Sequence, residues 1–123
     1  MPIIEPEVSI EAEDKQDAER RLVHAIVPHL DHLGEQKVAL KLTLPTVPGF
    51  YADLIAHPNV ARVVALSGGY DRDEANLLLA QNPGLIASFS RALLEGLSAD
   101  QGDDEFDRTL NTSIEAIYRA SLT

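Results

Sequence analysis

The sequence predicts an α/β fold with a parallel sheet, of the size of half a (β/α)8 barrel. Apolar segments of strand length alternate with segments whose apolar residues recur at helical spacing, an order typical of βαβ units. Four strands are each followed by a helix in 123 residues, whereas a complete (β/α)8 barrel takes about 250 residues. A small flavodoxin-like open sheet is the alternative architecture, although it normally has five strands.

The expected elements cover almost the whole chain. The strands are expected at residues 3–9, 37–44, 61–66 and 85–89. The helices are expected at residues 18–33, 48–56, 72–81, 91–97 and 105–120. Gly34, Pro45 and the Asn82-Pro83-Gly84 turn interrupt this pattern where elements should end. We therefore expect residues 1–123 to form a single half-barrel domain of four βα units with an extra C-terminal helix.

The composition excludes several classes of function. The formal net charge is −10, which disfavours general binding of nucleic acid or of an anionic membrane. No apolar run reaches the roughly 18 residues that a membrane span needs. The chain has no cysteine, which excludes disulfides and thiolate sites and is compatible with a cytoplasmic location. Because the chain begins almost directly with a strand, we expect it to be a fragment or to have an unusually placed start.

Lys41 is the candidate nucleophile. Side chains alternate between the two faces of a strand, so Val38, Leu40, Leu42 and Leu44 share one face of the second strand. That face is wholly apolar and should lie under helices, which leaves Lys41 on the barrel interior between Ala39 and Thr43. An isolated strand lysine is more often a surface residue.

Two carboxylates should share the interior with Lys41. In the first strand, Glu5 and Glu7 alternate with Ile4, Pro6 and Val8, so they point away from the apolar face. A lysine amine attacks a carbonyl only when neutral, and a neighbouring carboxylate can move protons as an imine forms. Lys41 with Glu5 and Glu7 therefore suggests Schiff-base chemistry on a carbonyl substrate, although a pair of glutamates is often only a solvated face.

Two neighbouring strand ends offer a phosphate site. Ser67, Gly68 and Gly69 lie between the third strand and a helix, where glycines allow a close backbone approach and free amides can hold a phosphate. Ser90 and Arg91 follow the fourth strand, and Arg91 supplies the positive charge that an acidic protein needs for an anion. A plain turn and a surface arginine are the alternative interpretations.

The histidines do not suggest a metal site. His24, His29 and His32 lie on one predicted helix or its end, and His57 lies in the following βα unit. No inward partner accompanies them, so we expect no metal and no cofactor.

Four segments together resemble bacterial class I fructose-bisphosphate aldolases. They are Pro-Ile-Ile-Glu-Pro-Glu-Val at 2–8, Leu-Lys-Leu-Thr-Leu-Pro-Thr at 40–46, Val-Val-Ala-Leu-Ser-Gly-Gly-Tyr at 63–70 and Ile-Ala-Ser-Phe-Ser-Arg-Ala-Leu at 86–93. The resemblance runs over essentially the whole chain. It implies a (β/α)8 barrel of which this chain supplies the C-terminal half, strands five to eight.

The resemblance also implies roles for the residues singled out above. Lys41 matches the Schiff-base lysine, Glu5 the glutamate that moves protons, and Glu7 a second glutamate near the lysine. Ser67 and Gly68, with Ser90 and Arg91, match the residues that bind a substrate phosphate.

The implied reaction is the reversible cleavage of fructose 1,6-bisphosphate into dihydroxyacetone phosphate and glyceraldehyde 3-phosphate, without a metal. The family's first-strand aspartate and its lysines on strands three and four lie outside the matched half. We therefore expect low activity from this chain alone, and either a homo-oligomer or a need for the missing N-terminal half. A non-catalytic half-barrel is the alternative, and an aldolase for another sugar phosphate is a third possibility.

Overall fold

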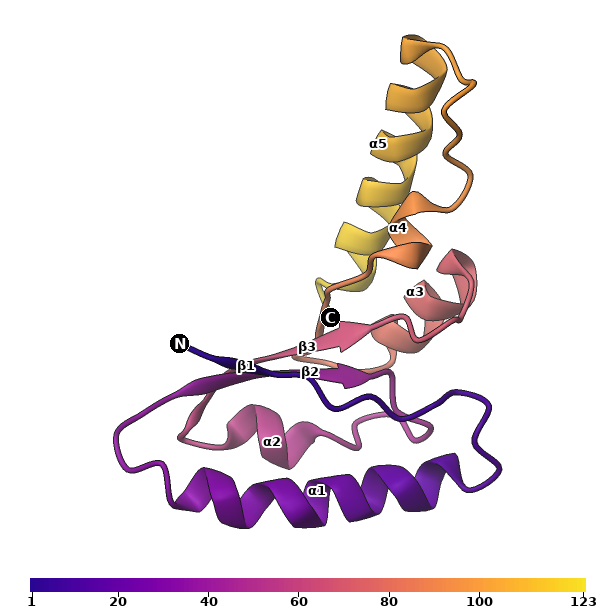
Figure 1. Cartoon of the computed structure of the whole chain (residues 1–123). Coiled ribbons are helices and arrows are strands. Elements are labelled where there is room, and N and C mark those ends of the chain that lie inside the picture. Colours follow the sequence, from indigo (N-terminus) through magenta and orange to yellow (C-terminus); the bar gives the residue numbers. More distant parts are fainter.

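A computed structural model describes all 123 residues and contains one parallel sheet of four strands (Figure 1). The strands are β1 (Ile3–Ile4), β2 (Val38–Thr43), β3 (Val60–Leu66) and β4 (Ile86–Ala87). They lie side by side in chain order, and every neighbouring pair is parallel. A flavodoxin-like sheet would have the order 2-1-3-4-5, so sequential order matches the barrel type. The predicted α/β half-barrel fold is confirmed.

Helices follow each strand, as the sequence pattern predicts. They are α1 (Lys15–Asp31), α2 (Ala52–Ala56), α3 (Arg72–Ala80), α4 (Arg91–Leu94) and α5 (Asp103–Ala120). In Figure 1, α1 and α2 lie along one face of the sheet, and α5 projects away from the sheet beside α4. No helix combines the length and the apolar character that crossing a bilayer would require.

The core forms on the predicted apolar face of β2. Leu40, Leu42 and Leu44 are at most 1% exposed and belong to one cluster with buried leucines of α1, α2 and α3. Burying each such side chain contributes about 2 kcal/mol. This face anchors β2 to the helices. On the opposite face, Ala39 and Thr43 are buried, whereas Lys41 between them is partly exposed.

The first strand is shorter than predicted. The pattern predicted a strand over 3–9, but ladder pairing with β2 ends at Ile4. Pro6 has no N–H to donate, and Val8 is instead held by the side chain of Thr43, whose Oγ1 accepts from the Val8 amide at 3.0 Å. The alternation of faces persists without the ladder: Pro6 and Val8 are half-buried, whereas Glu5 and Glu7 are exposed.

Other boundaries also differ from the prediction. The fourth strand covers only Ile86–Ala87 instead of 85–89. It lies at the edge of the sheet and pairs with β3 alone. The predicted helices 48–56 and 91–97 shorten to α2 and α4, and Gly96 has a positive φ that ends the latter. The first helix begins at Lys15 instead of residue 18, and Lys15 pairs with Glu19 one turn later.

Candidate active site

Lys41 and Glu5 meet on the face of the sheet opposite the buried leucines of β2. The Lys41 Nζ atom donates a hydrogen bond to Glu5 Oε2 at 3.1 Å. Their side chains are 26% and 50% exposed, so this ion pair is in contact with solvent. Because Lys41 lies in the centre of β2 and Glu5 directly follows β1, two neighbouring strands bring the two groups together.

One hollow collects nearly all of the predicted site residues. Its volume is about 170 Å³, and its lining consists of Glu5, Glu7, Lys41, Leu66, Ser67, Gly68, Ser88, Ser90 and Arg91. Most of these residues lie at or just beyond the carboxyl ends of the strands, the edge at which β/α barrels place their active sites. The structure therefore brings together seven of the eight residues that the sequence singled out, and Gly69 alone does not line the hollow.

The Ser67-Gly68-Gly69 segment makes a glycine-dependent turn between β3 and α3. Gly68 and Gly69 have φ values of +65° and +111°, in the region that favours glycine. Tyr70 N donates to Ser67 O at 3.1 Å and closes the turn, whereas the amides of Gly68 and Gly69 donate to no protein acceptor. Two free amides beside the hollow are suited to an anion.

Arg91 brings a positive charge to the same place. It is the first residue of α4, and it forms no ion pair within the protein. Its Nη1 atom lies 3.9 Å from the position that a Cβ on Gly69 would occupy. The ends of β3 and β4 therefore place one guanidinium beside the glycine turn, as the sequence predicted. An unpaired guanidinium next to free amides can bind a phosphate in a bidentate manner.

Two lining residues were not singled out from the sequence. Leu66 ends β3, and Ser88 directly follows β4, with its amide donating to Ala65 O at 2.8 Å. A position just beyond the carboxyl end of a strand was the available signal for Ser88. Nothing in its residue type separates it from other loop serines.

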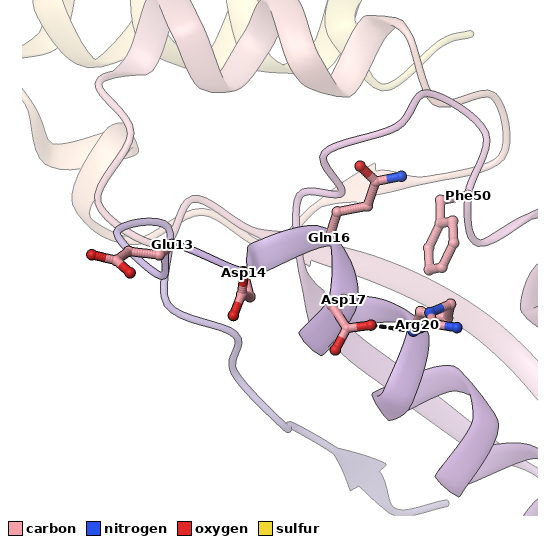
Figure 2. A pocket seen from close by; sticks show the side chains of 6 residues that line it. All are labelled: Glu13, Asp14, Gln16, Asp17, Arg20 and Phe50. Atoms are coloured by element: carbon pink, nitrogen blue, oxygen red, sulfur yellow. Dashed lines mark hydrogen bonds and ion pairs between the residues drawn. The ribbon is translucent and has the colours of Figure 1, made fainter.

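A second hollow lies away from Lys41, at the start of α1. Figure 2 shows its lining by Glu13, Asp14, Gln16, Asp17, Arg20 and Phe50, and its volume is about 440 Å³. It shares no residue with the hollow around Lys41. The hydrogen bond from Arg20 lowers the pKa of Asp17, so this carboxylate is already occupied by an arginine. No three histidine or carboxylate side chains of the chain gather as a metal site would require.

Comparison with known proteins shows which proteins this chain resembles. No protein-family model matches the chain. The chain is 56% identical over 124 aligned positions to "Fructose-bisphosphate aldolase class 1" of Clostridium acetobutylicum, an alignment that covers 100% of the chain. It is 53% identical over 122 positions, 99% of the chain, to the protein of the same name from Porphyromonas gingivalis. Over its whole length, the chain is similar to part of these two class 1 fructose-bisphosphate aldolases. The resemblance stated from the four segments is confirmed.

The match to class 1 fructose-bisphosphate aldolases covers only part of these relatives. The chain spans 42% of the length of the Clostridium acetobutylicum aldolase and 41% of that from Porphyromonas gingivalis. The sheet has the same incompleteness, because β1 and β4 each pair on one side only. A four-stranded parallel sheet with two open edges is what half of an aldolase barrel leaves.

Proposed function

We propose that this chain carries the Schiff-base part of a class I fructose-bisphosphate aldolase site. The observation that supports the proposal is the hollow that Lys41 shares with Glu5, Glu7, the glycine turn and Arg91. The substrate would be a sugar bisphosphate, with its keto group at Lys41. A phosphate of it would be held by Ser67, Gly68, Gly69, Ser90 and Arg91. The proposal includes a cytoplasmic location, with which the absence of cysteine is compatible.

The chemistry begins with the amine of Lys41. The neutral amine adds to the ketone carbon of fructose 1,6-bisphosphate, and the resulting carbinolamine loses water to give a protonated imine. Glu5, at 3.1 Å from Nζ, takes the proton from the attacking amine and returns one to the departing hydroxyl. Glu7 lies in the same hollow and is the second group available for these transfers.

Cleavage follows from the positive charge on the imine. A base removes the proton from the hydroxyl next to the bond that breaks, and glyceraldehyde 3-phosphate leaves as the aldehyde. The electron pair of the broken carbon–carbon bond moves toward the iminium nitrogen and forms an enamine. Protonation of the enamine carbon and hydrolysis then release dihydroxyacetone phosphate and regenerate Lys41.

Trapping of the imine tests this function. The purified chain is incubated with dihydroxyacetone phosphate and sodium borohydride, and peptide mass spectrometry locates the reduced adduct. We expect an adduct on Lys41 and none in Lys41→Met. Lys37→Met is the matched control, because Lys37 is an exposed lysine just before β2 and one of only three lysines in the chain.

Two results would contradict the proposal and favour a non-catalytic half-barrel. One is the absence of any adduct, and the other is an adduct that persists in Lys41→Met. Trapping reads the nucleophile without requiring full turnover. This matters because we further propose that turnover needs a homo-oligomer or the remaining part of the barrel. An apolar groove of about 560 Å³ beside the open edge of β4, lined by residues such as Ile114, Tyr118 and Leu122, supports that requirement.

A further inference from the structure

Thr43 does not line the hollow, but both its hydroxyl and its methyl group lie against segments that do. It lies two residues after Lys41 on the same face of β2 and is only 1% exposed. Its Oγ1 accepts a hydrogen bond from Val8 N at 3.0 Å and donates one to Val8 O at 2.9 Å. One hydroxyl therefore satisfies both backbone groups of a residue that is 35 positions away in sequence.

This contact replaces a strand ladder. Backbone pairing between β1 and β2 stops at Ile4, so no ladder holds the segment with Glu5 and Glu7. Val8 directly follows this segment, and the two bonds from Thr43 fix it against β2. The segment with Glu5 and Glu7 is thereby held at its start by the last ladder pair, at Ile4, and at its end by the hydrogen bonds of Thr43 to Val8.

The methyl group of Thr43 lies next to the glycine turn, the other part of the site. A Cβ on Gly68 would lie 3.3 Å from Thr43 Cγ2 and 3.0 Å from Ile10 Cγ2. These two methyl groups therefore occupy the space next to Gly68 that a larger side chain would need. Ile10 belongs to the same segment that Thr43 holds at Val8, so one buried threonine supports both the glutamates and the glycine turn.

We propose that Thr43 is a positioning residue that sets the glutamate segment with its hydroxyl and the phosphate-binding turn with its methyl group. This inference rests on the proposed aldolase function for its catalytic consequences. Two substitutions separate the role of the hydroxyl from that of the methyl group, because valine keeps the methyl group and serine keeps the hydroxyl.

The Thr43→Val variant tests the hydroxyl. We expect the amide hydrogen of Val8 to exchange with solvent about tenfold faster. The reason is that the N–H and the carbonyl of Val8 both lose the Thr43 hydroxyl as their hydrogen-bond partner. We expect borohydride trapping at Lys41 to slow about tenfold with dihydroxyacetone and with dihydroxyacetone phosphate alike, because Glu5 is no longer held beside the amine. Thr112→Val is the matched control, since that hydroxyl bonds only to Arg108 O on the exposed side of α5.

The Thr43→Ser variant tests the methyl group. We expect normal exchange at Val8 and normal trapping with dihydroxyacetone. With dihydroxyacetone phosphate, we expect the half-saturating concentration to rise several-fold, because the glycine turn has lost its support. Thermal melting accompanies each variant, and rescue of Val8 protection by serine separates a specific role from general destabilisation.

The proposal is overturned if Thr43→Val leaves Val8 exchange unchanged, or if the serine variant loses Val8 protection to the same degree. It is also overturned if Thr43→Ser changes trapping with dihydroxyacetone as much as trapping with dihydroxyacetone phosphate. If the parent chain forms no adduct at all, the aldolase function fails, and exchange at Val8 then decides the positioning role by itself.

Discussion

Two lysine–glutamate pairs in this chain have opposite environments. Lys15 and Glu19 form a pair whose side chains are 9% and 0% exposed, whereas Lys41 and Glu5 are 26% and 50% exposed. Each member of the buried pair has a further hydrogen-bond partner in the backbone. Lys15 Nζ donates to Leu44 O at 2.8 Å, and Glu19 accepts from Thr46 N at 3.1 Å. The pair of Lys41 and Glu5 has only its single contact at 3.1 Å.

The difference shows which pair is structural. The buried pair ties the first turn of α1 to the end of β2, and its charges are satisfied by neighbouring backbone groups. A lysine with so many partners is not available to attack a carbonyl. The open pair leaves Lys41 beside a hollow, partly exposed and with Glu5 as its one hydrogen-bond partner.

The largest effect on stability is expected from Glu19→Gln. The change removes the negative charge and leaves Lys15 buried without a counterion, which costs about 3 kcal/mol of unfolding free energy. Urea denaturation followed by circular dichroism measures the loss. The matched change in the open pair, Glu5→Gln, should cost less than about 1 kcal/mol because solvent screens that contact. Equal losses of unfolding free energy in Glu19→Gln and Glu5→Gln would contradict the expectation that burial makes the pair of Lys15 and Glu19 more important for stability.

Much of the fold followed from periodicity in the sequence. The alternation of Val38, Leu40 and Leu42 with Ala39 and Lys41 was sufficient to orient β2, because the apolar face had to lie under helices. Strand lengths were less predictable. The alternation continues through Glu5 and Glu7, but the ladder stops because the Thr43 side chain takes over the pairing, and no local pattern encodes that long-range contact.

The clustering of the candidate site residues was predictable where they follow strand ends. Ser67, Gly68, Ser90 and Arg91 could be placed together because parallel strands end at one edge of the sheet. The buried pair was not anticipated. Lys15 and Glu19 fell in or beside a stretch that reads as polar, and their burial depends on Leu44 and Thr46, about 30 residues later in the chain.

A smaller effect is expected at the turn that borders the open pair. Gly68→Ala places a Cβ at a φ of +65°, where it also meets Ile10 Cγ2 at 3.0 Å. We expect a loss of about 2 kcal/mol, of which about 1 kcal/mol is backbone strain. Gly34→Ala is the control, since its φ is +60° and nothing lies within 4 Å of the added atom. The difference in urea midpoint between these variants measures the crowding, and identical midpoints would exclude it.

The smallest effect concerns Tyr51, which lies close to the buried pair. Tyr51 is 1% exposed and its hydroxyl has no hydrogen-bond partner. Burial, and secondarily the charge of Glu19, raises the pKa of Tyr51 well above its usual value. At neutral pH, Tyr51→Phe therefore removes only an unsatisfied hydroxyl, and we expect between no change and a gain of about 1 kcal/mol.

The same tyrosine should make the buried region sensitive to alkali. Its raised pKa means that the folded protein keeps Tyr51 neutral while the unfolded chain ionises above about pH 10. The contribution to stability is fully present below that pH and falls by up to about 1.4 kcal/mol for each further pH unit. Urea denaturation at about pH 9 and pH 11 measures this slope, which should be shallower in Tyr51→Phe. If Tyr51→Phe loses unfolding free energy with pH as steeply as the parent chain, the group that makes the protein sensitive to alkali is not Tyr51.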